Sequence, residues 1–229
     1  MTEQKKRRNW GGYAASIPFF LLVIFFLIAP LSNMVRESFI SPESGAVTLA
    51  NYLDVLSKPI YLASIRNSLY LTFISTVVGL ILSFIAAMAT AQATKNLSSK
   101  FLSILNMVAN FAGLPLAFAF IILVGKSGVL IEILDQFGIP LLDDFNIYSS
   151  QGLLLVFVYF QIPLGTLVLL PSFQSIRKEW KESAALMKAS PFQFWWHIGI
   201  PVLLPSLADT FSMLFANALT AYATPYMMI

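Results

Sequence analysis

Five long apolar runs constrain this chain more than any other feature of its sequence. They extend over about residues 13–35, 68–93, 101–125, 153–173 and 198–229. Each supplies the roughly 20 residues that an α-helix needs to cross the hydrocarbon core of a membrane. Lipid offers the backbone no hydrogen-bond partners, so such runs cross as helices. The sequence therefore predicts an all-α fold, a polytopic bundle of five membrane-spanning helices in one domain over residues 1–229.

The composition agrees with this class and leaves little room for an enzyme. Hydrophobic residues make up 58% of the chain and charged residues 11%, against roughly 45–50% and 25% in soluble domains. Cysteine is absent and His197 is the only histidine, which excludes thiolate sites and the two-histidine zinc motif. Gly125-Lys126-Ser127 lacks the earlier glycine of a phosphate-binding loop, because Phe120 stands there. We expect no catalytic, cofactor or metal site, and we assign His197 to an interfacial aromatic belt with Trp195 and Trp196.

The basic residues predict the orientation of the chain. Placing the N-terminus in the cytoplasm puts ten of the 14 Lys and Arg residues inside: Lys5, Lys6, Arg7, Arg8, Lys95, Lys100, Arg177, Lys178, Lys181 and Lys188. Four remain outside: Arg36, Lys58, Arg66 and Lys126. The loop 126–151 then faces outward, and the segment 175–198 faces the cytoplasm. Since the basic residues gather at span ends, no nucleic-acid partner is expected.

The segment 175–205 is charged and amphipathic, and it lies between two of the apolar runs. Six of its residues would each cost on the order of 3 kcal/mol at the centre of a bilayer, namely Arg177, Lys178, Glu179, Lys181, Glu182 and Lys188. Trp180, Ala184 and Met187 recur at helical spacing and so line one face. This pattern predicts a helix outside the lipid.

A second short helix is predicted to begin directly after it. Ser190 suits the N-cap, Pro191 suits the first helical position, and Gln193 suits the return bond of a capping box. The segment is therefore predicted to form a helix, a sharp turn and a second helix at the membrane surface.

The run from Glu182 to Pro191, followed by Ile200-Pro201, resembles the EAA loop of the membrane subunits of ABC importers that depend on a binding protein. That loop typically reads E-A-A, three residues, G-A-S-P, and then an apolar residue and proline after some nine residues. Ser183 stands where the second residue is usually Ala. Lys188 stands where Gly is usual, and this bears on the turn because Lys adopts positive φ only at a steric cost. Weaker matches lie elsewhere, at Asn51-Tyr52, Leu114-Pro115, Gln161-Ile162-Pro163 and Ala221-Tyr222-Ala223-Thr224-Pro225.

The resemblance implies a type I ABC importer-like permease subunit in a bacterial cell inner membrane. It implies as partners separate ATPase subunits that bind ATP and Mg, a second permease subunit in a homo- or heterodimer, and a periplasmic or extracellular solute-binding protein. A sixth span is common in the family, so we expect that this chain is truncated. The resemblance assigns the coupling interface with the ATPase to Glu182, Ser183, Ala184, Ala185, Met187, Lys188, Ala189, Ser190 and Pro191.

The resemblance suggests a small charged solute as the substrate, such as a polyamine, a phosphonate or thiamine. Asp209 lies about two turns into the last run, and an acid within a membrane helix is by default a functional hypothesis. It could equally reach interfacial water in a structural role. Asn217, Thr220 and Tyr222 follow it and could line a polar path, although small polar residues also serve helix packing. An ion-coupled secondary transporter using Asp209 is the alternative; its expected inverted repeats and further intramembrane ionisable groups are not found.

Overall fold

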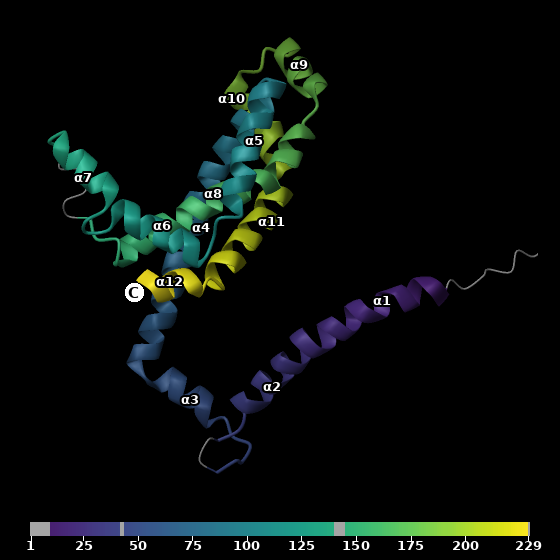
Figure 1. The fold of residues 1–229 in the computed structure, drawn as a ribbon. Coiled ribbons are helices and arrows are strands. Elements are labelled where there is room, and N and C mark those ends of the chain that lie inside the picture. The colour runs from purple at the N-terminus through teal and green to yellow at the C-terminus, as the bar shows by residue number, and fades with distance from the viewer. Residues whose placement is uncertain (1–9, 42–43, 140–144, 229) are drawn as a thin grey trace, which may run out of the picture. The chain divides into compact units, whose positions relative to one another are not determined.

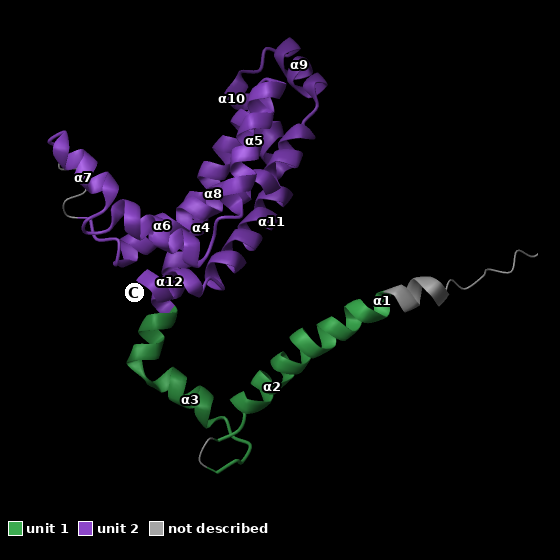
Figure 2. Ribbon diagram, in the orientation of Figure 1, with its two compact units in different colours: residues 1–65 green, residues 66–229 purple. Residues whose placement is uncertain are grey.

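The computed structural model describes residues 10–41, 44–139 and 145–228, and the chain divides into two units, 1–65 and 66–229 (Figure 2). The first unit holds a continuous helical stretch formed by α1 (Trp10–Val23), the π-helical turn η1 (Ile24–Ile28) and α2 (Ala29–Ser38). A loop then leads to α3 (Ala50–Ser57). The Asn51 side chain fixes this loop, because its Nδ2 donates to the carbonyls of Ser38 and Ile40 at 3.0 Å each.

The second unit is built from helices (Figure 1), and α4 runs into it from the first unit. The elements are α4 (Pro59–Gln92), α5 (Lys95–Ala109), α6 (Leu114–Val124), α7 (Val129–Gln136), α8 (Ser150–Gln174), α9 (Lys178–Leu186), α10 (Pro191–Phe194), η2 (Trp195–Gly199), α11 (Ile200–Leu219) and α12 (Ala223–Met228). Five helical stretches are long and apolar enough to span a membrane: Ser16–Ser38, Pro59–Gln92, Leu114–Gln136, Ser150–Gln174 and Pro191–Leu219. The predicted all-α fold with five spans is thus confirmed.

α8 is the most buried of these spans, and small residues let α4 approach it closely. Gln161 Nε2 donates to Ser75 Oγ at 2.9 Å, and Ser83 Oγ donates to the Ile162 carbonyl at 3.1 Å. A Cβ at Gly79 would stand 2.9 Å from Gln161 Cβ. Only glycine therefore permits this separation of the two helices.

The expected third span, 101–125, is not one helix. α5 ends at Ala109 and α6 begins at Leu114, with Gly113 between them at a φ of 69°. Glycine reaches this left-handed conformation at no steric cost. Pro115 lies in the first turn of α6, where its missing N–H would have no partner in the helix. Pro115 therefore marks the start of a new helix.

The expected last span, 198–229, is also interrupted. Its helix begins earlier, at Pro191, and continues through η2 into α11, which ends at Leu219. The chain then leaves the helical path and forms α12 from Ala223. α12 lies beside α6, so the two short helices that follow the two breaks are neighbours (Figure 1).

Candidate functional site

The predicted helix, turn and second helix are present at one end of the second unit. α9 and α10 lie together there and connect α8 to α11 (Figure 1). α9 has nine residues, and α10 has four residues that continue without interruption into η2 and α11. The second helix is therefore the beginning of a membrane-spanning helix rather than a separate piece.

The turn after α9 has the hydrogen bonds of a Schellman motif. The Ala189 N–H donates to the Ala184 carbonyl at 3.0 Å, and the Lys188 N–H donates to the Ala185 carbonyl at 2.9 Å. Lys188 has a φ of 58° and is the only non-glycine residue with a positive φ among the described parts of the chain. The EAA-like pattern has glycine here, and glycine adopts a positive φ without the steric cost that Lys188 meets.

The start of the second helix is capped as the sequence predicts. Ser190 Oγ accepts from the Gln193 N–H at 3.2 Å, while Gln193 Oε1 accepts from the Ser190 N–H at 2.7 Å. Pro191 occupies the first turn. Because both ends of the turn are closed by hydrogen bonds, the two helices hold a fixed geometry.

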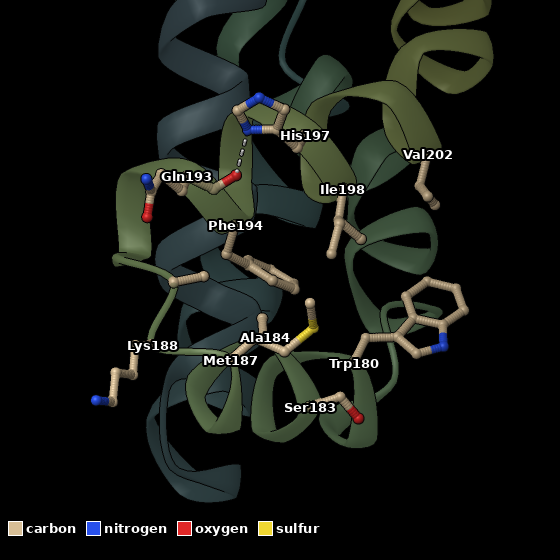
Figure 3. Close-up of a pocket in the computed structure, with 11 residues that line it drawn as sticks. Trp180, Ser183, Ala184, Met187, Lys188, Gln193, Phe194, His197, Ile198 and Val202 are labelled. Carbon is tan, nitrogen blue, oxygen red and sulfur yellow. Dashed lines mark hydrogen bonds between the residues drawn. The ribbon is translucent and has the colours of Figure 1, made fainter.

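A hollow of about 660 Å³ lies between α9 and the η2 segment. Its lining residues are Trp180, Ser183, Ala184, Met187, Lys188, Ala189, Gln193, Phe194, His197, Ile198 and Val202. Figure 3 shows Met187, Phe194 and Ile198 around its centre, with the Lys188 side chain directed away from them. The hollow is thus apolar at its centre and has charge at its edge.

The predicted interface residues divide into exposed and buried ones. Met187 is 83% exposed and Leu186, which the sequence analysis did not single out, is 86% exposed. Glu182, Ser183, Ala185, Lys188, Ser190 and Pro191 are exposed, and Ala189 is half-buried. Ala184 is only 7% exposed because it packs into a core cluster of its own chain that contains Phe173 and Phe194. Ala184 thus packs mainly against its own chain and contributes to the wall of the hollow, while its assignment to the interface stays a prediction.

The two neighbouring tryptophans do not form one aromatic belt. Trp195 is half-buried and makes ring contacts with Phe84, Phe173 and Phe194. Trp196 is 61% exposed and stacks on exposed Phe192 at 6.2 Å. Helical geometry sends consecutive side chains in different directions, so only Trp196 has the exposure that a belt residue needs.

His197 belongs to the second helix through a local contact. Its Nδ1 lies 3.0 Å from the Gln193 carbonyl oxygen, one turn earlier (Figure 3). Among the described residues, no three His, Asp or Glu side chains lie close enough to hold a metal ion.

A second hollow, of about 180 Å³, lies where the two helix breaks meet. It is lined by Ala109, Ala112, Gly113, Phe160, Leu164, Asn217, Ala221, Tyr222, Ala223 and Thr224. Of the residues predicted for the substrate path, the structure brings Asn217 and Tyr222 together here. Asp209 and Thr220 do not line this hollow; Asp209 is exposed on α11, and Thr220 is exposed at its C-cap. Gly113 and Pro115 were the signals in the sequence from which the first break could have been found.

Comparison with known proteins gives a family match over most of the second unit. The family described as "Binding-protein-dependent transport system inner membrane component" matches residues 79–229. A relative named "Probable sulfate transport system permease protein", from Helicosporidium sp. subsp. Simulium jonesii, is 24% identical over 205 residues, covering 90% of this chain and 72% of the relative. A ferric transport system permease protein of Actinobacillus pleuropneumoniae is 24% identical over 220 residues, covering 93% of this chain. The chain spans only 31% of that relative's length.

A thiamine transport system permease protein of Brucella abortus is 29% identical over 126 residues, covering 52% of this chain and 23% of the relative. Among solved structures, the chain is similar to a bacterial ABC transporter involved in the import of the acidic polysaccharide alginate, with a TM-score of 0.75 and 17% identity. That match covers 96% of this chain and 80% of the other. At this identity the similarity establishes the fold.

Proposed function

Because this chain belongs to the family of binding-protein-dependent transport system inner membrane components, we propose that its α9–turn–α10 segment is the surface on which separate ATPase subunits act. The family makes the chain a permease subunit of an ABC importer, a multi-pass membrane protein, rather than an ion-coupled transporter. ATP and Mg then bind the partner, and this chain supplies the path and the mechanical connection.

The observation that carries the coupling role is the exposure of two apolar side chains next to a hollow. Leu186 and Met187 are among the most exposed large apolar residues of the chain, at the C-terminal end of a charged helix. The predicted orientation places this helix in the cytoplasm, where exposed apolar groups favour contact with a partner. A partner side chain could fill the 660 Å³ hollow between Trp180 and Ile198.

The local geometry favours rigid-body transmission of motion. The Schellman turn and the capping box fix α9 against α10, and α10 continues into α11. Ala184 anchors α9 to the core beside Phe173 of α8. Movement of α9 with a closing pair of ATPases would therefore displace the ends of α8 and α11 together and switch access to the path.

The two helix breaks support a path for solute in the outer half of the bundle. Non-helical backbone at membrane depth is tolerated where it lies within protein or lines an aqueous cavity. Here the break after α5 and the break after α11 share one small hollow that contains Asn217 and Tyr222. Asp209 and Thr220 extend this polar surface along α11. A second permease subunit would complete the path, and a solute-binding protein would load it from outside.

The experiment is co-purification of the permease variants with the ATPase subunit, together with assay of transport-coupled ATP hydrolysis. Met187→Ala and Glu182→Ala should both reduce the retained ATPase. Loss of a buried charged contact at Glu182 would cost about 2–5 kcal/mol, or roughly 30-fold to several-thousand-fold in affinity. Lys178→Ala, at an exposed position with no described side-chain contact, is the matched control.

Ala184→Leu serves as a comparison, because it should affect the folding of the permease rather than only its contact with the ATPase. It should destabilise the permease itself by overpacking the cluster around Phe194. Equal ATPase retention and coupling in the Glu182, Met187 and Lys178 variants, with intact folding, would contradict the proposed coupling role.

A further inference from the structure

α11 has two faces of different character. Its buried residues are Leu203, Thr210, Leu214 and Ala218. Its exposed residues include Asp209, Ser212 and Ala216, and the C-cap Thr220 is also exposed. These four recur at intervals of three, four and four and so share one face. The exposed face thus carries a carboxylate among small and hydroxyl side chains, together with the apolar Val202 and Met213, and it ends at the break beside Asn217.

Asp209 is the single charged residue of α11. It is the tenth of the 20 residues of α11, about 15 Å from either end at the rise of an α-helix. This is deeper than its expected position near the cytoplasmic end, because the helix begins at Pro191. The helices around the break, α6, α8, α11 and α12, contain no other Asp, Glu, Lys, Arg or His. Among the described residues, no side chain or backbone group forms a hydrogen bond or ion pair with the Asp209 carboxylate.

A bare carboxylate at the middle of a span is costly against lipid, so this face has to meet water or protein. If it lines the proposed path, the carboxylate has no basic partner in α6, α8, α11 or α12. Such a charge attracts cations and repels anions, and low-dielectric walls strengthen both effects. The neutral groups of Asn217, Tyr222 and Thr224 in the nearby hollow supply hydrogen bonds and no opposing charge.

We propose that Asp209 makes this permease selective for cationic solutes over oxyanions, an inference that rests on the proposed path along α11. The solute is thus of the organic or metal cation class, and oxyanions of the sulfate or phosphonate type are disfavoured. Among the related proteins described above, those named for thiamine or ferric transport then resemble this chain in cargo charge more than the one named for sulfate.

The absence of native cysteine makes the test direct. Ser212→Cys, one turn from Asp209, is introduced into the full transporter in membranes and treated with two methanethiosulfonates, one with a trimethylammonium group and one with a sulfonate. We expect the ratio of cationic to anionic labelling rates to be roughly tenfold higher with Asp209 than with Asp209→Asn, in line with a nearby unit charge partly screened by water. Asp209→Glu should keep the high ratio.

Thr220→Cys, on the same face, is a distant control that is measured with Asp209 left unchanged. It lies about 16 Å away along the helix, beyond a Debye length, so its ratio of cationic to anionic labelling rates should approach that of a free thiol.

Labelling of Ser212→Cys with the same ratio in the Asp209 and Asp209→Asn backgrounds overturns cation selection and leaves the aqueous path standing. Failure of both reagents to label either cysteine shows that the face is not aqueous, which overturns the path and this inference together.

Discussion

The ammonium group of Lys181 lies 5.6 Å from the centre of the Trp195 ring. Trp195 in turn contacts Phe84 of α4 and Phe173 of α8. A cation over an aromatic ring at this distance contributes about 0.5–1 kcal/mol at an exposed site. The contact therefore joins α9 to the aromatic core through a side chain that the sequence alone would place in solvent.

Replacing Lys181 by Gln should weaken the connection between α9 and the bundle. Loss of about 0.5–1 kcal/mol corresponds to a two- to fivefold shift toward a detached α9. We expect stimulation of ATP hydrolysis by the loaded binding protein to fall by a similar factor. Lys178→Gln, on the same helix without a ring partner, is the control. Identical stimulation in both variants would show that the contact has no part in coupling.

The sequence predicts the local chemistry of the α9–α10 segment well because that chemistry depends on neighbouring residues. Ser190, Pro191 and Gln193 form the cap that their spacing predicts, and the substitution of Lys188 for glycine falls on the positive-φ position. Periodicity also places Trp180, Ala184 and Met187 along one hollow. Periodicity does not identify what covers a face, so the burial of Ala184 by its own chain could not be predicted.

The helix breaks are missed for a different reason. Hydropathy measures transfer into lipid, and the residues around Gly113 and Ala221 are apolar enough to continue a run whether or not they are helical. Neither break could be located from hydropathy, and the first depends on the positive φ of Gly113, which hydropathy does not measure. The closeness of α6 and α12 depends on long-range packing.

Gly199→Ala should destabilise the protein through Trp195. A Cβ at position 199 would overlap the indole ring of Trp195, which is held by the aromatic cluster and cannot easily move. Overpacking of this kind costs about 1–3 kcal/mol, which corresponds to a fall of about 2–12 °C in apparent melting temperature for a chain of this size. The fall in melting temperature is measured by thermal unfolding of the purified protein.

The double variant Gly199→Ala/Trp195→Phe tests the assigned cause. The smaller ring leaves room for the new methyl group, so part of the lost stability should return. If the Gly199→Ala protein had the same apparent melting temperature as the wild type, the η2 turn would have to widen to accept a side chain.

The orientation predicted from basic residues can be checked with single cysteines in the native cysteine-free background. Lys188→Cys and Ser127→Cys both place a thiol at an exposed position. An impermeant maleimide should label position 127 in intact cells and position 188 only after the membrane is opened. Labelling of position 188 from outside would reverse the orientation and remove α9 from the side where ATP is available.

Lys188→Gly should stabilise the turn that the EAA-like segment is built around. Lys188 holds a φ of 58°, and the left-handed conformation costs a non-glycine residue about 1–2 kcal/mol. Glycine removes that cost but loses more backbone entropy on folding, about 0.5–1 kcal/mol, so a net gain of up to about 1.5 kcal/mol is expected. The apparent melting temperature should rise by up to about 6 °C. Lys188→Val, whose branched Cβ is least compatible with positive φ, should lower it and reduce ATPase retention. Equal melting temperatures and equal ATPase retention in the Gly and Val variants would show that the turn is not held at positive φ in the assembled transporter. A rigid connection from α9 to α11 would then not explain coupling.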